Sequence, residues 1–185
     1  MSTSAGKVWT YDDYAALPDD GKRYEVIEGE LLEMPSPNAR HQRLAFWLSG
    51  TFFVHLQARG GGEALPAPFD AVLSSTNVVQ PDLIFVQDAD RDRITLLNIQ
   101  GAPTLAVEVL SDARHDRVRK RRLYEVFDVP EYWIVDPFLQ QVEVYVPTAS
   151  GVYGSPAIFK AGDTLTTGLL PGLSIDIAAL LAAGR

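Results

Sequence analysis

The stretch LAVEVLS, residues 105–111, is an apolar strand pattern with one charge at its centre. Its run of leucine, alanine and valine is typical of a strand inside a sheet that is covered on both faces. A carboxylate at such a position costs several kcal/mol to bury unless a cation or a hydrogen-bond donor meets it. Glu108 is therefore predicted to have a charged or hydrogen-bonding partner elsewhere in the chain.

The composition predicts one domain inside the cell. The chain has 185 residues, 46% of them hydrophobic, which suits a single core, so we expect one domain over residues 1–185. No stretch approaches about 20 consecutive apolar residues, and the N-terminal segment lacks the apolar core of a signal peptide. We therefore expect no membrane segment and a cytoplasmic location.

The absence of cysteine limits the chemistry. It excludes disulfides, thiolate zinc sites and cysteine nucleophiles, so any metal must be held by oxygen or imidazole ligands, which favours a hard cation. The formal net charge of -8 argues weakly against nonspecific binding of nucleic acid. One segment is nevertheless basic, because RHDRVRKRR, residues 114–122, holds six of the sixteen Lys and Arg beside a single acid.

Hydrophobic periodicity predicts helices and strands around one sheet. Helices are expected at 9–17, at 38–59, from 112 or 114 to 127, and in the C-terminal IDIAALLAA. Strands are expected at 24–34, as a hairpin that turns at Gly29, and then at 63–73, 78–86, 103–110, in YWIVD and, as an edge strand, at 140–147. This order predicts an α/β or α+β fold, with a central mixed sheet flanked by helices and an N-terminal β-hairpin.

Two carboxylates are expected at the end of this sheet. Pro81-Asp82 opens one interior strand, and Glu108 lies within another. Together they could hold Mg²⁺, which prefers a few carboxylates, water and phosphate oxygens. Such a metal lowers the pKa of a bound water and neutralises charge on a phosphate.

The basic helix offers one cation to this site. With 100° per residue, Lys120 lies about 60° from Leu123 on the face directed to the core, whereas Arg114, Arg117 and Arg121 lie more than 100° away and face solvent. Asp116 lies about 20° from Leu123. The Lys120 ammonium could thus run along apolar surface to the strand ends and orient or activate a water.

Simpler interpretations remain open. Asp116 and Lys120 are four residues apart, which also suits an ion pair on one helix, and Asp82 after proline is also typical of a turn. His41 follows the same helical stripe as Leu44, so it is equally a buried structural histidine or a functional one. Glu25 shares a face with Ile27 and is a weak third candidate ligand.

Several ordered motifs resemble one known family. PD at 81–82, EVLS from 108, DRVRKRRLY from 116 and VPEYWIVDP from 129 are similar to the Uma family (type two) of restriction endonucleases, formerly a domain of unknown function, in the PD-(D/E)xK nuclease superfamily. RYEVIEGELLEM, PSPNARHQ and VVQPDLIFV match as well. The similarity extends to about residue 146 and so covers most of the chain.

This resemblance implies a restriction-endonuclease-like core that hydrolyses phosphodiester bonds with Mg²⁺, for which Mn²⁺ can substitute. Asp82 and Glu108 match the metal-binding acids, and Lys120 matches the catalytic lysine. The superfamily places that lysine two residues after the acid, where this chain has Leu110, so the resemblance implies that the lysine has moved to the next helix. Glu25 and His41 match further positions that look functional.

The leading hypothesis is therefore a Mg²⁺-dependent endonuclease acting on nucleic acid, with DNA favoured. Asp82, Glu108 and Lys120, with His41, would be catalytic, and Arg117 and Arg121 would contact the nucleic-acid backbone. One alternative is an inactive nuclease fold that binds nucleic acid or protein, which Leu110 and the net charge favour. Another is a two-carboxylate hydrolase such as a glycosidase, which needs no metal. A homodimer is possible, with the apolar C-terminal segment across its interface.

Overall fold

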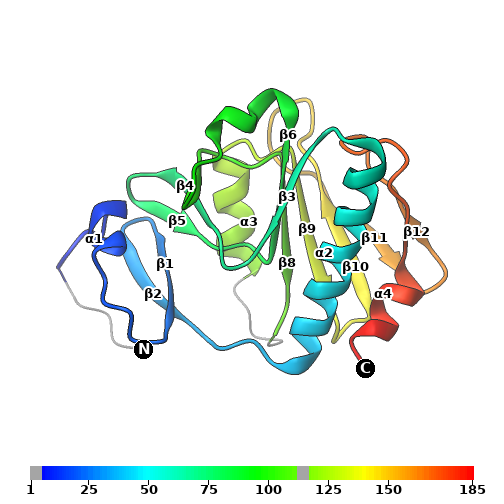
Figure 1. Cartoon of the computed structure of the whole chain (residues 1–185), viewed down its shortest axis with the longest axis horizontal. Coiled ribbons are helices and arrows are strands. Elements are labelled where there is room, and N and C mark those ends of the chain that lie inside the picture. Colours follow the sequence, from blue (N-terminus) through cyan, green and yellow to red (C-terminus); the bar gives the residue numbers. More distant parts are fainter. Residues whose placement is uncertain (1–5, 112–116) are drawn as a thin grey trace.

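The computed structural model describes residues 6–111 and 117–185 (Figure 1). The helices of this part are α1 (Tyr11–Ala15), α2 (Ala39–Arg59), the 3₁₀-helix η1 (Asp88–Arg93), α3 (Arg117–Val126) and α4 (Ile177–Ala183). The predicted positions of Arg114 and Asp116, and the predicted start of the basic helix, lie outside the described residues.

The larger sheet carries the central strands. Its order is β11-β10-β9-β8-β6-β3, from β3 (Gly62–Pro66), β6 (Leu83–Gln87), β8 (Leu105–Val109), β9 (Glu131–Asp136), β10 (Gln141–Tyr145) and β11 (Ala157–Lys160). β8 and β9 are parallel, and the other neighbours are antiparallel. This confirms the mixed sheet and the interior position of Glu108, but β10 is not the predicted edge strand because β11 pairs with its outer side.

A second sheet stands beside the first. Its order is β2-β1-β5-β4-β7, from β1 (Arg23–Ile27), β2 (Glu30–Met34), β4 (Asp70–Ser74), β5 (Asn77–Val79) and β7 (Asn98–Gln100). The predictions of single strands at 63–73 and 78–86 are wrong, because each segment contributes one strand to each sheet. Prolines 68 and 81 stand at the two breaks, where a residue without an N–H interrupts a ladder. Asp82 therefore lies at a corner between the sheets.

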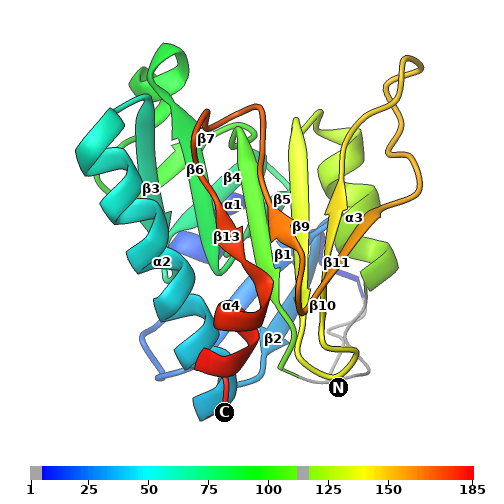
Figure 2. The same ribbon diagram turned by 90° about the vertical axis from the view of Figure 1, so that its right-hand side faces the viewer.

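Helices cover the larger sheet on both faces. Helices α2 and α4 pack on one face, while α3 and the smaller sheet pack on the other (Figures 1 and 2). Leu48 of α2 and Leu180 of α4 share one core cluster with Val107 of the sheet, and Leu123 of α3 shares the second with Ala106. The alternation of Ala106 and Val107 between clusters shows that both faces of β8 are buried, as its apolar run predicted.

Local signals fix the elements that carry the site. The hairpin turns at Glu28 and Gly29, which both have positive φ, and it sets the register of β1. The side chain of Asn38 accepts a hydrogen bond from the backbone N–H of His41 and so begins α2. α1 is shorter than the predicted 9–17, although Thr10 does form its capping box.

The C-terminal segment contains two short strands and the last helix. Two short strands, β12 (Thr164–Leu165) and β13 (Ile175–Asp176), pair with each other before α4. The apolar side chains of α4, including Ile177 and Leu181, lie in the core of their own chain. The homodimer itself stays a prediction. No helix in the described ranges is long and apolar enough to cross a membrane.

Candidate active site

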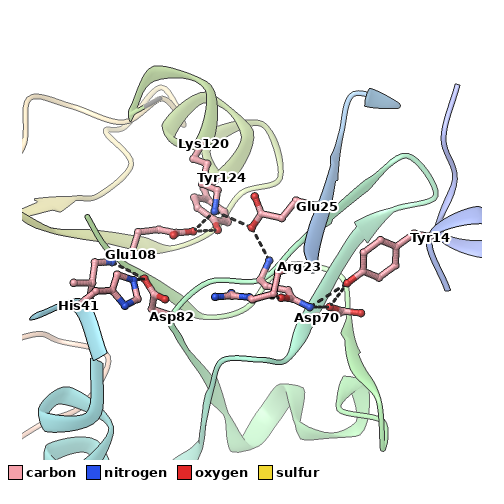
Figure 3. A network of polar contacts seen from close by, with 11 residues as sticks. Tyr14, Arg23, Glu25, His41, Asp70, Asp82, Glu108, Lys120 and Tyr124 are labelled. Carbon is pink, nitrogen blue, oxygen red and sulfur yellow. Dashed lines mark hydrogen bonds and ion pairs between the residues drawn. The ribbon is translucent and has the colours of Figure 1, made fainter. Parts of the chain in front are cut away.

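A small cavity of about 40 Å³ lies where both sheets, α2 and α3 meet. Its polar lining comes from separate elements, and the side chains converge as Figure 3 shows. The polar residues of the lining are Arg23, His41, Gln80, Asp82, Glu108, Ser111 and Lys120. The cavity therefore collects the predicted catalytic residues.

Asp82 is held at the corner before β6. Its Oδ2 accepts a hydrogen bond from the backbone N–H of Val109 at 2.8 Å and lies 3.0 Å from His41 Nε2. The other oxygen, Oδ1, has no hydrogen-bond partner within the described residues. One carboxylate oxygen thus anchors the side chain to β8 and α2, which leaves the other for a ligand.

Glu108 is the charge inside β8 and is 4% exposed. Its Oε1 accepts hydrogen bonds from Lys120 Nζ at 2.9 Å and from the Tyr124 hydroxyl at 2.8 Å. Burial raises the pKa of Glu108 to about 7; the Lys120 charge opposes this rise, and Asp82 and Glu25 add to it. The partners that the sequence predicted for Glu108 are thus the Lys120 ammonium and the Tyr124 hydroxyl, while the carboxylates of Asp82 and Glu25 lie close enough to repel its negative charge.

Lys120 reaches this site from α3, as its helical face predicted. Its buried Nζ donates to Glu108 Oε1 and to Glu25 Oε1, the latter at 2.8 Å. Burial lowers the pKa of the ammonium, but the two carboxylates outweigh burial and raise it above its usual value. Lys120 therefore stays charged. Leu110, by contrast, is buried in the apolar core cluster beneath α3.

Glu25 and His41 each bring to the site one buried polar atom that forms no hydrogen bond with the described residues. Glu25 Oε1 accepts from Lys120 and from the backbone N–H of Gln80, whereas Glu25 Oε2 is buried without a partner among the described residues. His41 Nδ1 is likewise buried, and no hydrogen-bond partner for it lies in the part of the chain that the structure describes. Buried atoms of this kind are expensive to leave unsatisfied, so each is a candidate contact for a ligand or an ordered water.

The donor set suits a hard cation bound by few protein ligands. No group of three or more His, Asp or Glu side chains in the described part is arranged to hold a metal ion. Asp82 and Glu108 nevertheless repel each other electrostatically across one cavity, which a shared cation would relieve. Mg²⁺ is often held by only one or two carboxylates, with water and substrate phosphate as its other ligands. The two acids therefore fit such an ion.

The two arginines predicted to contact nucleic acid differ from each other. The Arg117 guanidinium does not face solvent freely, because it pairs with buried Asp136 at 3.1 Å and with buried Glu143. Arg121 is exposed, as predicted, and lies over the ring of Tyr145. α3 thus uses Arg117 to attach its first turn to β9 and β10.

Sequence reasoning missed three residues of the site. Tyr124 lies one helical turn beyond Lys120, and Arg23 lies two residues before Glu25 on the same face of β1, so spacing alone was a usable signal for both. Gln80 donates its backbone N–H to Glu25 Oε1 and accepts from Arg23 Nε. Nothing in the local pattern marked it.

The sequence matches the model of one protein family over most of its length. The model of the Uma2 family, described as "Putative restriction endonuclease", matches residues 11–178. The chain belongs to the Uma2 family. The match spans every site residue discussed above.

The fold of this Uma2-family chain also matches a solved structure. A protein from Anabaena variabilis, described as a "putative nuclease belonging to DUF820", superposes with a TM-score of 0.79 at 18% sequence identity, over 95% of this chain and 99% of that chain. At this identity the match shows the fold, which is thus a nuclease-like α+β fold. No curated protein matches the chain.

Proposed function

We propose that the chain is a Mg²⁺-dependent endonuclease that hydrolyses phosphodiester bonds of nucleic acid, with DNA as the first substrate to test. The observation that carries the proposal is the convergence of Asp82, Glu108 and Lys120 on one small cavity. Family membership and the nuclease-like fold support it. Mn²⁺ is expected to substitute for Mg²⁺.

The two acids would hold the metal. Asp82 has one oxygen fixed by Val109 and His41, and Glu108 has one oxygen fixed by Lys120 and Tyr124, so each would offer its remaining oxygen. Mg²⁺, when bound, would lower the pKa of a water and neutralise charge on the phosphate. Glu25, whose Oε2 is free, would serve as a further ligand only after a change of side-chain position.

Lys120 would act as a fixed positive charge. Because its pKa is raised, it does not accept a proton from water near neutral pH. Its ammonium would instead orient the attacking water and stabilise negative charge on the reacting phosphate. His41 would hold Asp82 through Nε2, with its unpartnered Nδ1 directed to a water or phosphate.

The nucleic-acid backbone would be bound by exposed cations of α3. Arg121 fits this role, whereas Arg117 would first have to leave Asp136 and Glu143. Binding of this kind weakens as the salt concentration rises because counterions are released from the phosphates. A homodimer would place two sites on opposite strands.

A plasmid-relaxation assay with Mg²⁺ or Mn²⁺ tests the proposal. Asp82→Asn, Glu108→Gln and Lys120→Met should each lose cleavage, and Glu33→Gln, which changes an exposed acid on β2, should keep it. Calorimetric titration with Mn²⁺ should show binding that Glu108→Gln loses and Glu33→Gln retains. Absence of metal-dependent cleavage of plasmid, single-stranded DNA and RNA would overturn the proposal.

An inactive binding protein is the second candidate. The burial of Leu110 in the apolar core favours it, because no lysine stands at the superfamily's usual position. Such a protein would bind oligonucleotides without cutting them in Mg²⁺ or Mn²⁺. Hydrolysis of another substrate without any metal would instead support the two-carboxylate hydrolase.

A further inference from the structure

Arg23 is a cation at the candidate-site cavity, and no carboxylate of the described residues pairs with it. Its side chain lines the cavity with Asp82 and Glu108, and its Nε donates a hydrogen bond to Gln80 Oε1 at 3.2 Å. Among the described residues it forms no ion pair, so both terminal amino groups of the guanidinium have no protein partner. In Figure 3 the guanidinium points toward the side of the site where Asp82 lies.

Gln80 holds Arg23 in this orientation. The amide Nε2 of Gln80 donates to Asp70 Oδ1 at 2.7 Å and to the Tyr14 hydroxyl at 3.0 Å, which leaves Oε1 to face Arg23. The backbone N–H of Gln80 donates to Glu25. The Gln80 amide cannot turn over without losing its hydrogen bonds to Asp70 and Tyr14, so the position of the Arg23 guanidinium is set in advance.

The charge pattern around the cavity favours a ligand with negative oxygens. Lys120 is already paired with Glu25 and Glu108, whereas Arg23 is paired with no acid in the described ranges. The planar guanidinium forms two parallel hydrogen bonds to carboxylate or phosphate. An anion bound to Arg23 would neutralise the guanidinium, while a cation bound to Asp82 and Glu108 would neutralise the two acids.

The size of the cavity restricts that ligand further. A volume of about 40 Å³ accommodates a cation and a few water or oxygen atoms, but no nucleobase or sugar. The group that enters must therefore be small and oxygen-rich, while the rest of the ligand stays outside. A backbone phosphate of a nucleic acid has this form.

We propose that Arg23, positioned by Gln80, binds a backbone phosphate of the nucleic acid at the mouth of the cavity. This inference rests on the nuclease function proposed above and assigns a phosphate-binding position within that site. Because the contact is to the backbone, it adds affinity for every sequence equally and reads no base.

Fluorescence anisotropy of a labelled 20-nucleotide DNA duplex, with Ca²⁺ in place of Mg²⁺ and at several KCl concentrations, tests the proposal. Arg23→Gln should weaken binding at low salt by about tenfold or more, which is typical for loss of a charged hydrogen bond. The slope of log K against log salt should decrease by about one. Arg91→Gln, which removes an exposed arginine on η1, is the matched control and should change neither quantity.

Further variants separate phosphate binding from a structural role. Arg23→Lys keeps the charge, so it should keep the salt slope while losing several-fold in affinity. Gln80→Ala should behave similarly because the guanidinium is no longer held. Two duplexes of unrelated sequence should lose affinity equally in Arg23→Gln. Thermal unfolding of each variant identifies losses that come from misfolding, and Arg23→Lys then carries the test if Arg23→Gln does not fold.

The outcomes distinguish this inference from the proposed function. If the wild type cuts no substrate but its DNA binding depends on Arg23 as described, the nuclease proposal fails and the inference stands. If folded Arg23→Gln binds DNA with the affinity and salt slope of the wild type, the inference is overturned, whether or not cleavage persists. A wild type that binds neither DNA nor RNA overturns both.

Discussion

Lys120 Nζ lies 2.9 Å from Glu108 Oε1, although the two residues stand 12 positions apart and come from α3 and β8. The same nitrogen contacts Glu25 on the smaller sheet. One buried ammonium therefore connects a helix with two different sheets. Because the ion pairs are almost completely buried, this lysine matters to stability as well as to the proposed chemistry.

Replacing Lys120 should destabilise the fold strongly. Lys120→Met leaves Glu25 and Glu108 buried without their counter-charge, and breaking a buried pair in this way costs about 3–5 kcal/mol in the free energy of unfolding. Adding Glu25→Gln should recover part of that loss, because one uncompensated charge is removed. Urea unfolding measures both. A single variant within about 1 kcal/mol of the wild type would contradict the buried ion pairs.

Part of this site was predictable because its signals are local. Glu108 stands out as a charge within an apolar strand, and the helical angle of Lys120 relative to Leu123 set it on the buried face of α3. Both expectations are confirmed by burial and by the contact between Glu108 and Lys120. The catalytic roles of these residues stay predictions.

The remainder depends on partners far away in the sequence. The contact between Arg23 and Gln80 spans 57 positions, and hydrophobic periodicity carries no information about it. The split of 78–86 between two sheets was hidden for a similar reason, since β5 and β6 have the same apolar, extended pattern. The angle between Arg117 and Leu123 on the helix predicted that Arg117 faces solvent. That angle carries no information about the strands β9 and β10, whose Asp136 and Glu143 pair with Arg117.

Gly62 is predicted to be irreplaceable at the start of β3. Its φ is +159°, and a Cβ there would lie 2.3 Å from the backbone oxygen of Val86 and 2.5 Å from the ring of Phe85. Gly62→Ala should therefore lower the free energy of unfolding by about 3 kcal/mol, through overpacking and backbone strain. Gly61→Ala is the matched control: its φ is +102° but nothing lies near its Cβ, so we expect a loss of about 1 kcal/mol. Equal losses in urea unfolding would exclude the close contact.

Arg117 should act on stability more than on nucleic-acid binding. Arg117→Met would leave Asp136 and Glu143, whose side chains are 4% and 8% exposed, without their common cation. We expect a loss of about 2–3 kcal/mol in urea unfolding, less than for Lys120 because the Arg117 side chain is 29% exposed. Arg121→Met, which removes an exposed arginine from the same helix, should cost less than about 1 kcal/mol. The reverse order of the two losses would argue against the contacts seen for Arg117.

Asp70 should make the free energy of unfolding fall as the pH rises above about 4. Burial raises the pKa of Asp70 above its ordinary value of 3.8, against the hydrogen bonds from Gln80 and Tyr14 that lower it. Below pH 3.8 the folded and unfolded chains both carry the proton, so Asp70→Asn should match the wild type within about 0.5 kcal/mol, since Asn can still accept both hydrogen bonds.

As the pH rises through 3.8, the unfolded chain releases the Asp70 proton before the folded chain does, so the wild type loses stability until the raised pKa is passed. Asp70→Asn has no proton to release at this position. Its free energy of unfolding relative to the wild type should therefore increase from pH 3.5 to a plateau near neutrality, as urea unfolding at each pH would measure. A difference that stays constant or falls with pH would mean that burial does not raise the pKa of Asp70 above its ordinary value.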